Sequence, residues 1–256
     1  MTTVCVIGLG HVGLPTAALL AKSGATVLGV DVNQHVVAAL NAGKTHIQEP
    51  RILPLVESVV RSGNLKASTS TPQADVFMIA VPTPVKDDHS PDHDLVAAAA
   101  AAIALQLRKG NLVILESTVG PGITAGLVKT TLEKSGLKAG SDFLLAYCPE
   151  RILPGNALQE LVSNDRVIGG LNAASSEAAH EVYKRFVHGK LHVTDATTAE
   201  VVKLSENTYR DVNIALANEI GLLSQRLGLD AWEVVKLANF HPRVHLLQPG
   251  PGVGGH

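Results

Sequence analysis

Residues 4–13, Val4-Cys5-Val6-Ile7-Gly8-Leu9-Gly10-His11-Val12-Gly13, decide the fold of this 256-residue chain. The four apolar residues predict a strand. The glycines after them have the spacing Gly-x-Gly-x-x-Gly at the start of a predicted helix, Gly13–Lys22. In this context Gly8 permits a tight turn, Gly10 lets the backbone approach a pyrophosphate, and Gly13 lets the helix pack closely on the strand. The stretch predicts the first βαβ unit of a dinucleotide-binding fold.

Asp31 ends the second apolar run, 18 residues after Gly13. An acid at this position accepts hydrogen bonds from the hydroxyls of an adenosine ribose and repels a 2′-phosphate. The start of the helix that follows the glycines offers free N–H groups and a partial positive charge to the phosphates. The pattern therefore favours NAD over NADP as cofactor, and the alternative is a glycine-rich turn without a ligand.

Short runs rich in Val, Ile and Leu alternate with longer segments of helical period. The runs predict strands at Val4–Ile7, Thr26–Val30, Val76–Val81, Leu112–Leu115, Phe143–Tyr147, Val167–Ile168 and Leu191–Val193. The longer segments predict helices at Gly13–Lys22, Gln34–Ala42, Ile52–Arg61, Leu95–Leu107, Ile123–Ser135 and Ser175–Phe186. This alternation predicts right-handed βαβ units and an α/β fold with a doubly wound, mostly parallel, Rossmann-type sheet.

The pattern changes after the last predicted strand. Residues Thr197 to Glu200 have the spacing of a capping box, Thr followed three residues later by Glu. No proline and a single glycine occur from there to Arg226, which predicts an unusually long helix. Asp230 is predicted to cap a shorter second helix. We therefore expect two domains, a Rossmann-like domain at 1–195 and an all-helical segment at 196–256.

Composition limits the classes of function. Hydrophobic residues make up 46% and charged residues 17%, a balance that argues against disorder and that a parallel sheet buried on both faces explains. A net charge of −2 and 3% aromatic residues argue against a nucleic-acid partner and an acidic membrane surface. No apolar run reaches the roughly 20 residues of a membrane span. Two cysteines without CxxC spacing and no basic signal start predict a chain of the reducing cytoplasm.

Polar and turn residues directly follow three of the predicted strands. They are Pro82-Thr83-Pro84, Glu116-Ser117-Thr118 and Cys148-Pro149-Glu150-Arg151. Each segment alone is more often a helix cap or a turn. Ligands of open α/β sheets, however, bind beyond the carboxyl ends of the strands. Together with the glycine loop, these segments predict one polar crevice facing the cofactor.

The long helix carries a second group of candidates. Lys203, Asn207 and Arg210 are spaced i, i+4, i+7 and share one face. This face would hold an anionic substrate or stabilise an oxyanion, and the alternative is a solvated stripe. His241 and Arg243 follow in a Pro-containing segment as a further candidate anion clamp. The acidic, His-containing stretch 87–94 has no recognised ligand spacing, so no metal site is predicted.

Taken together, these motifs resemble the UDP-glucose/GDP-mannose dehydrogenase family, over essentially the whole chain and in the family's order. The matching segments are Gly8–Gly13 with Asp31, Val81–Pro84, Glu116–Thr118, Tyr147–Arg151, Lys203–Asn207 and Gly250–His256. The details of Cys148–Gly155, Asn164–Gly170 and His241–Val244 look most like the branch that acts on UDP-N-acetyl-D-mannosamine. Pro154 stands where the UDP-glucose branch has a second glutamate, which argues against UDP-glucose as substrate.

The resemblance implies a four-electron oxidation of a UDP-sugar at C6, from alcohol through aldehyde to carboxylate, with two NAD and one water, for surface polysaccharide synthesis. It implies that Val12 and Asp31 contact the pyrophosphate and ribose side of NAD, and that Thr83 and Thr118 contact the nicotinamide half. By analogy with related Rossmann proteins, the long helix is expected to carry the contacts of a homodimer.

The resemblance also assigns roles to residues around the substrate. Thr118 and Glu150 would position the water, and Lys203 with Asn207 would stabilise oxyanions and serve proton transfer. The residues implied to bind the nucleotide sugar are Arg151, Ile152, Lys203, Asn207, Arg210, His241, Arg243 and Gly254.

One departure from the family concerns the nucleophile. In the family, a cysteine directly follows the Gly-Gly-His that is here Gly254–His256, and it forms the thiohemiacetal needed for the second hydride transfer. Cys5 and Cys148 lie in or beside predicted strands and are expected to be structural. We expect the family's C-terminal UDP-binding domain to lie outside this chain as well. We therefore expect an N-terminal fragment that is impaired in catalysis. The alternatives are a non-catalytic NAD-binding or dimerisation module, a single-step hydroxyacid dehydrogenase, and a UDP-N-acetylglucosamine 6-dehydrogenase.

Overall fold

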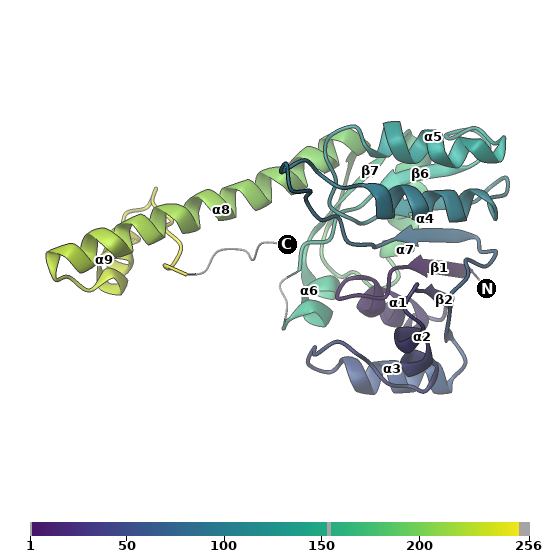
Figure 1. Ribbon diagram of the computed structural model, residues 1–256, viewed down its shortest axis with the longest axis horizontal. Helices are drawn as coiled ribbons and strands as arrows, with labels where there is room; N and C mark the ends of the chain where they lie inside the picture. The colour runs from purple at the N-terminus through teal and green to yellow at the C-terminus, as the bar shows by residue number, and fades with distance from the viewer. Residues whose placement is uncertain (1, 153–154, 251–256) are drawn as a thin grey trace. The chain divides into compact units, whose positions relative to one another are not determined.

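The computed structural model describes residues 2–152 and 155–250. The chain forms two compact units, Met1–Val201 and Val202–His256. The first unit is built on an eight-stranded sheet (Figure 1). Its strands are β1 (Thr3–Ile7), β2 (Thr26–Val30), β3 (Leu65–Ser68), β4 (Val76–Ile79), β5 (Leu112–Leu115), β6 (Leu144–Tyr147), β7 (Arg166–Gly170) and β8 (Leu191–Asp195). Its helices are α1 (Gly13–Lys22), α2 (Gln34–Asn41), α3 (Ile52–Arg61), α4 (Asp94–Ala104), α5 (Lys129–Leu132), α6 (Ala157–Ser163) and α7 (Ala173–Tyr183).

The strand order is β3-β2-β1-β4-β5-β6-β7-β8. This order turns back between β1 and β4, as in doubly wound folds, where the switch point marks the ligand-binding edge. Neighbouring strands run parallel, with the exception of β6 and β7 among the described strands. The predicted mostly parallel Rossmann-type fold is confirmed. The antiparallel β6–β7 pair means that β7 begins at the edge of the sheet where β6 ends.

Residues on the strands alternate between the two faces of the sheet, as the pleat requires. Val4 and Val6 of β1 face α1, α2, α3, α6 and α7, whereas Cys5 and Ile7 face α4 and α5. In Figure 1, α4 and α5 lie together on one side of the sheet. Both faces are therefore covered, which accounts for the continuous apolar runs in the central strands.

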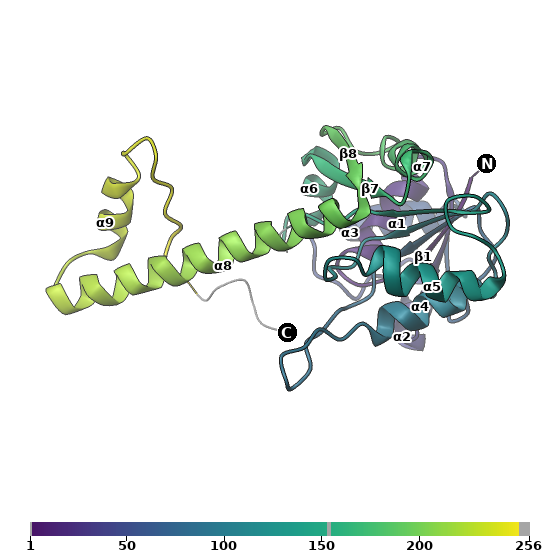
Figure 2. The ribbon, with the colours of Figure 1, turned by 90° about the horizontal axis from the view of Figure 1, so that it is seen from above.

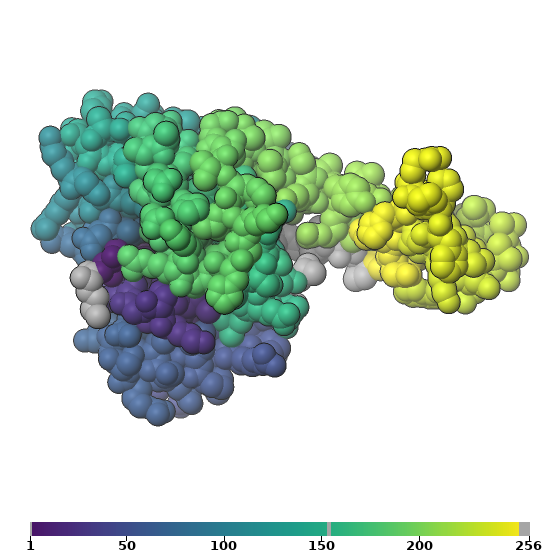
Figure 3. All heavy atoms as spheres, turned by 180° about the vertical axis from the view of Figure 1, so that it is seen from behind, coloured from purple at the N-terminus to yellow at the C-terminus, as the bar shows by residue number. Residues whose placement is uncertain are grey.

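The segment just after α7 lies next to the beginning of the chain. Figure 3 shows the green residues of this region beside the purple N-terminal segment. Arg185, just after α7, donates a hydrogen bond to Thr2 Oγ1 at 2.9 Å. This contact joins two parts of the chain that are far apart in sequence.

The long helix α8 (Ala196–Leu227) has 32 residues, and Figure 2 shows it as one continuous helix. It begins before the predicted capping box, so that prediction is wrong. Asp195 caps the helix instead, because its carboxylate accepts hydrogen bonds from Thr198 N and Oγ1 at 2.9 and 2.6 Å. These bonds hold the pKa of Asp195 below its ordinary value.

The side chain of Glu200 does not cap α8 but hydrogen-bonds to the start of the helical segment that begins near Thr124. It is fully buried and accepts from Gly122 N at 2.6 Å, Thr124 N at 2.8 Å and Thr124 Oγ1 at 2.6 Å. After this point in the chain, the structure has three short elements where one helix, Ile123–Ser135, was predicted. They are a π-helical turn (Thr124–Val128), α5 and a 3-10 turn (Glu133–Ser135). Predicting a single helix was wrong in this detail.

The second unit contains the rest of α8 and the helix α9 (Ala231–Ala238). Asp230 caps α9 as predicted, since its side chain accepts from Trp232 N at 2.9 Å. Asn218 of α8 exchanges two hydrogen bonds with the backbone of Gly250, both 2.9 Å long. In the part of the chain that the structure describes, no helix combines the length and apolar character needed to cross a membrane.

Candidate functional site

The glycine loop after β1 is shaped by two backbone contacts. Gly8 has φ +91°, and a Cβ on it would lie 2.4 Å from Ala80 O. A Cβ on Gly13 would lie 1.8 Å from Gly8 O. Side chains at these two positions are excluded by the fold itself. A Cβ on Gly10, in contrast, would meet no described atom within 4 Å. The fold does not require glycine there, so the open space beside Gly10 fits a ligand close to the backbone.

Asp31, directly after β2, is tied to this loop. Its Oδ2 accepts from Leu9 N at 3.0 Å and its Oδ1 accepts from Asn33 N at 2.9 Å. Each carboxylate oxygen keeps a lone pair that can accept a further hydrogen bond. No described side chain caps the N-terminus of α1. Within the first turn, Leu14 N donates to Gly10 O and Thr16 N to Val12 O, both at 3.1 Å, and Pro15 has no N–H, so the N–H of Gly13 is the one left for an anion. The first half of the site has the donors and acceptors that suit a phosphate and a ribose.

The ends of β4 and β5 are joined by Ser117. Its Oγ donates to Val81 O at 2.8 Å, and Thr118 comes next in the chain. Thr83 follows Val81 by two residues, and both threonines are partly exposed. This bond links the two segments that carry the predicted nicotinamide contacts.

The segment after β6 is held from the start of β7. Arg151 donates from Nη1 to Asp165 O at 2.7 Å, and Asn164 Nδ2 donates to Arg151 O at 3.0 Å. Glu150 Oε2 accepts from Ile152 N at 2.9 Å. These bonds fix the backbone around Glu150, Arg151 and Ile152, three of the predicted site residues.

Glu49 supports the same region from the segment before α3. Its carboxylate is buried and accepts from Gly155 N at 2.7 Å and from Ala157 N at 3.3 Å. The second bond caps the N-terminus of α6. Neither a role for Glu49 nor the helix α6 was predicted from the sequence.

A buried polar cluster lies where β5, β6 and β7 meet. Glu116 Oε1 accepts from Tyr183 OH at 2.7 Å and from Arg166 Nη1 at 3.4 Å. Glu116 Oε2 is buried without a hydrogen-bond partner among the described residues. Burial raises the pKa of Glu116 above its ordinary value, although Arg166 and Tyr183 oppose the shift. Glu116 and Arg166 both lie in motifs of the sequence, but contact between them was not predicted.

Both cysteines are buried free thiols. Burial raises the pKa of Cys5 to about 12 and also raises the pKa of Cys148. The thiolate is the nucleophilic form of cysteine, so neither side chain has the properties of a nucleophile.

The four residues predicted to act in catalysis divide between the two units. Thr118 and Glu150 belong to the first unit, and Lys203 and Asn207 to the second. Lys203 is buried, and Asn207 and Arg210 on the same helix face are partly buried. The neighbouring positions 205, 208 and 209 are exposed. The face is therefore not a uniformly solvated stripe, and the catalytic roles remain predictions.

Two predicted substrate residues, His241 and Arg243, are exposed in the second unit. Arg243 N donates to His241 Nδ1 at 3.3 Å, which folds the segment back on itself. The predicted residue Gly254 lies outside the described residues, as does Pro154. The substrate set is thus spread over both units.

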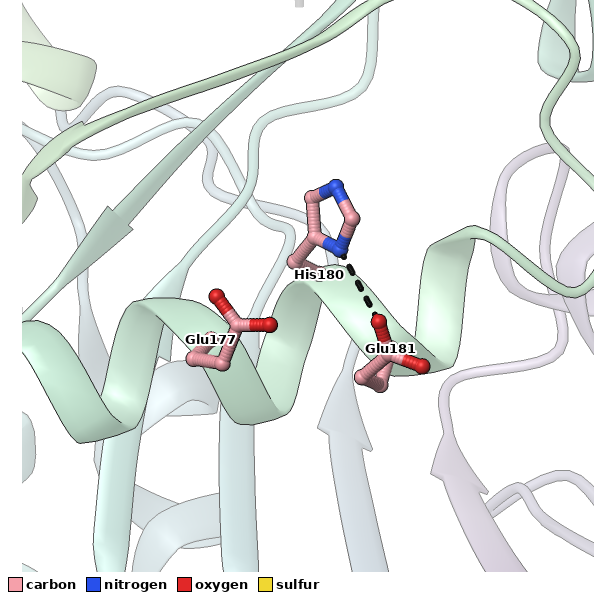
Figure 4. A group of neighbouring side chains, drawn as sticks. All are labelled: Glu177, His180 and Glu181. Carbon is pink, nitrogen blue, oxygen red and sulfur yellow. Dashed lines mark hydrogen bonds and ion pairs between the residues drawn. The ribbon is translucent and has the colours of Figure 1, made fainter.

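Glu177, His180 and Glu181 on α7 form a group with the spacing of metal ligands (Figure 4). Their ligand atoms lie within 4.8 Å of one another. Glu181 Oε1, however, already lies 3.3 Å from both His180 Nδ1 and Lys184 Nζ. Both glutamates are exposed, so the group has the character of a surface ion-pair network.

Family models match both parts of the chain. Residues 2–187 match the NAD binding domain of the UDP-glucose/GDP-mannose dehydrogenase family. Residues 197–256 match the central domain of the same family.

Individual relatives align along nearly the whole chain. A UDP-N-acetyl-D-mannosamine dehydrogenase of Campylobacter jejuni is 52% identical over 99% of this chain and 64% of its own length. An NDP-N-acetyl-D-galactosaminuronic acid dehydrogenase of Ralstonia nicotianae is 50% identical over 99% of this chain and 62% of its own length. The solved UDP-N-acetyl-mannosamine dehydrogenase of Staphylococcus aureus is 49% identical and superposes with a TM-score of 0.93, covering 100% of this chain and 62% of that one. The chain thus spans somewhat under two thirds of the length of these relatives.

Proposed function

The chain belongs to the UDP-glucose/GDP-mannose dehydrogenase family, and we propose that it serves in the NAD-dependent four-electron oxidation of a nucleotide sugar at C6. We propose UDP-N-acetyl-D-mannosamine as the sugar, oxidised to the uronate for the synthesis of a surface polysaccharide. The observation that carries the proposal is the glycine loop, with open space at Gly10 and with Asp31 fixed beside it. The names of the relatives support the substrate class.

The residues of the first unit fit the two ends of NAD. Gly8, Gly10, Val12 and Gly13 would hold the pyrophosphate at the start of α1. Asp31 would accept from the ribose hydroxyls with the lone pairs that Leu9 N and Asn33 N leave unused. Thr83 and Thr118 would contact the nicotinamide half. NAD, when bound, supplies the acceptor for the hydride that leaves C6.

The remaining roles follow from the family resemblance. Thr118 and Glu150 would hold the attacking water, and Lys203 with Asn207 would stabilise the negative charge that develops on the substrate oxygen. Arg151, Ile152, Arg210, His241, Arg243 and Gly254 would bind the nucleotide sugar. In this proposal, residues 1–195 form the NAD-binding domain and 196–256 the central helical domain. Because both cysteines are buried free thiols, a cytoplasmic location goes with the proposal.

Relatives with about equal identity to this chain are named for different sugars. One is named for UDP-N-acetyl-D-mannosamine and another for an NDP-N-acetyl-D-galactosaminuronic acid. The identity of the sugar is therefore the part of the proposal that most needs a direct assay. A protein that carries this sequence and spans the full length of its relatives is to be supplied with NAD and, separately, with UDP-N-acetylmannosamine, UDP-N-acetylglucosamine and UDP-glucose. We expect turnover of the first with two NADH formed per sugar.

Each other outcome of that assay favours a named alternative. A single NADH per sugar contradicts the four-electron reaction and favours a single-step dehydrogenase. Turnover of UDP-N-acetylglucosamine instead changes the sugar but keeps the reaction. Binding of NAD with no turnover of any sugar favours a non-catalytic NAD-binding module.

We also propose that the second unit forms a homodimer contact. Tyr209, Val212, Leu216, Leu223 and Leu227 of α8 are each about half exposed. Their spacing of three, four and seven residues places them in one stripe along the helix, as in helix–helix seams. Exposed apolar surface of this kind marks interaction sites.

The dimer contact is tested by light scattering of the purified protein. We expect the mass of two chains for the wild type and of one chain when Leu216 and Leu223 are both replaced by Glu. Leu105→Glu, which changes an exposed leucine after α4 in the first unit, is the matched control and should remain dimeric. A wild-type mass of one chain contradicts the proposal.

A further inference from the structure

Arg166 has an unusual position for a buried cation. It is the first residue of β7, the strand that runs antiparallel to β6. Tyr147 at the end of β6 pairs with Gly169, so continuing this register carries Arg166 past the carboxyl end of β6. The side chain therefore lies at the sheet edge where the predicted site residues Thr118 and Glu150 follow their strands.

The guanidinium of Arg166 contacts groups from two neighbouring strands. Nη1 lies 3.4 Å from Glu116 Oε1, just after β5, and 3.7 Å from Cys148 Sγ, just after β6. The guanidinium carbon lies 4.7 Å from the centre of the Tyr183 ring, a cation–π distance. Arg166 is 3% exposed and Glu116 is fully buried, so solvent does not screen these contacts.

Burying a charged pair is a costly way to stabilise a fold. The loss of hydration offsets most of the attraction between the charges, and apolar side chains of the same volume are often at least as stable. What the arginine provides in addition is geometry, because the planar guanidinium lies over the Tyr183 ring and this fixes the direction of Nη1 toward Glu116 and Cys148. The position of those partners is therefore the feature to explain.

The two partners lie directly beside candidate site residues. Glu116 precedes Ser117 and Thr118, and Ser117 in turn binds the end of β4 through Val81 O. Cys148 precedes Pro149 and Glu150. The two residues before Arg166 also contact the segment after β6, since Asn164 and Asp165 both hydrogen-bond to Arg151.

We propose that Arg166 is a positioning residue that holds the segments after β5 and β6 in a fixed relation, so that Thr118 and Glu150 face the nicotinamide end of the cofactor. The inference rests on the proposed function, because it takes the contact of Thr118 with the nicotinamide half from there. It concerns that end of the dinucleotide alone. Asp31 and Gly10, which would bind the adenosine end, follow β2 and β1 and have no hydrogen bond to the Arg166 cluster among those the structure describes.

The two ends of the cofactor can be measured separately. NAD and ADP-ribose share the adenosine and the pyrophosphate, and only NAD carries nicotinamide. We would measure by calorimetry the affinity of the purified chain for each, in the wild type and in Arg166→Lys. Lysine keeps the positive charge but lacks the planar guanidinium, which lies over the Tyr183 ring while its Nη1 contacts Glu116 and Cys148.

For Arg166→Lys we expect NAD affinity to fall about fivefold, the loss of roughly one hydrogen bond, while ADP-ribose affinity stays within about twofold. Tyr183→Phe is the matched control. It removes one hydrogen bond to Glu116 from the α7 side but leaves both strand-end contacts of Arg166, so the ratio of the two affinities should not change. A thermal melt shows that each variant is folded.

A second variant keeps the test decisive if Arg166→Lys does not fold. The pair Glu116→Gln with Arg166→Met removes both buried charges together and leaves none unpaired. The same selective loss of NAD affinity is expected for it. The inference is overturned if folded variants bind NAD as tightly as the wild type, or if NAD and ADP-ribose weaken equally. A wild-type chain that binds neither ligand overturns the proposed function, and this inference falls with it.

Discussion

The glycine loop after β1 and the polar cluster after β5 and β6 are organised by different physical effects. In the loop, backbone sterics decide: Gly8 and Gly13 have no room for a Cβ, at 2.4 and 1.8 Å from backbone oxygens. In the cluster, side-chain chemistry decides: Glu116, Arg166 and Tyr183 are buried together, and Arg166 and Tyr183 both donate hydrogen bonds to Glu116 Oε1. In the proposed function, the first region would fix where a dinucleotide binds, and the second would hold the segments that face its reactive end.

This difference predicts different responses to mutation. A steric region should fail when volume is added and tolerate changes where space is open. A charged cluster should fail when one partner is removed and recover when both are removed, because an unpaired buried charge is the costly state.

The largest effect is expected at Arg166. Arg166→Met leaves Glu116 buried beside no cation, and the free energy of unfolding should fall by about 3–5 kcal/mol. Adding Glu116→Gln should recover a large part of that loss. Urea denaturation of the wild type, both single variants and the double variant measures the coupling. Arg185→Met, at an exposed arginine that donates a hydrogen bond to Thr2, is the control and should cost less than about 1 kcal/mol. If the loss in free energy of unfolding in the double variant equals the sum of the losses in the two single variants, Glu116 and Arg166 are not coupled.

A smaller effect is expected in the glycine loop. Gly13→Ala places a Cβ on Gly8 O and should lower the free energy of unfolding by about 3 kcal/mol, together with cofactor binding. Gly10→Ala is the matched variant, because its Cβ would enter open space. It should stay within about 0.5 kcal/mol of wild-type stability and yet lose about tenfold in NAD affinity. Denaturation measures the effect on stability, and calorimetry measures the effect on NAD affinity. A Gly10→Ala chain with full NAD affinity would contradict binding of the pyrophosphate beside Gly10.

The smallest effect concerns pH. Glu116 has a raised pKa in the folded chain, so the stability linked to its protonated form is complete below the ordinary pKa of about 4.3. That contribution is lost as pH rises through the folded pKa. Melting temperatures from pH 4 to 8 should therefore fall in the wild type relative to Glu116→Gln as pH rises.

Glu181→Gln is the control with the opposite sign. Hydrogen bonds from Lys184 and His180 lower the pKa of Glu181, so its contribution is present above the ordinary pKa and lost as pH falls. Parallel pH profiles for the wild type and Glu116→Gln would mean that burial of Glu116 does not shift its titration.

The sequence predicted the parts of the fold that depend on local pattern. Apolar runs located seven of the eight strands, and the spacing of the glycines with Asp31 located the loop. The resemblance to the UDP-glucose/GDP-mannose dehydrogenase family is confirmed by matches to residues 2–187 and 197–256. The strand β3 was not predicted, because in Leu65-Lys66-Ala67-Ser68 only Leu65 is buried and the apolar pattern is weak.

What the sequence did not predict depends on partners distant in the chain. Glu200 matched a capping box by spacing, but its carboxylate binds Gly122 and Thr124, more than seventy positions away. Arg166 and Glu116 are separated by fifty positions. Glu200 and Glu116 are each charged residues with apolar neighbours in the sequence. That pattern indicates that the side chain is buried with a partner, but it does not identify the partner.

The central claim is that the glycine loop and Asp31 bind the adenosine end of NAD, and calorimetry of NAD binding to the wild type and to Asp31→Ala tests it most directly. We predict that the wild type binds NAD more tightly than NADP and that Asp31→Ala weakens NAD about tenfold or more, since charge-assisted hydrogen bonds to the ribose are lost. Asp142→Ala, at the opposite edge of the sheet before β6, should bind as the wild type does. An Asp31→Ala chain that is folded and binds NAD with unchanged affinity would contradict the account.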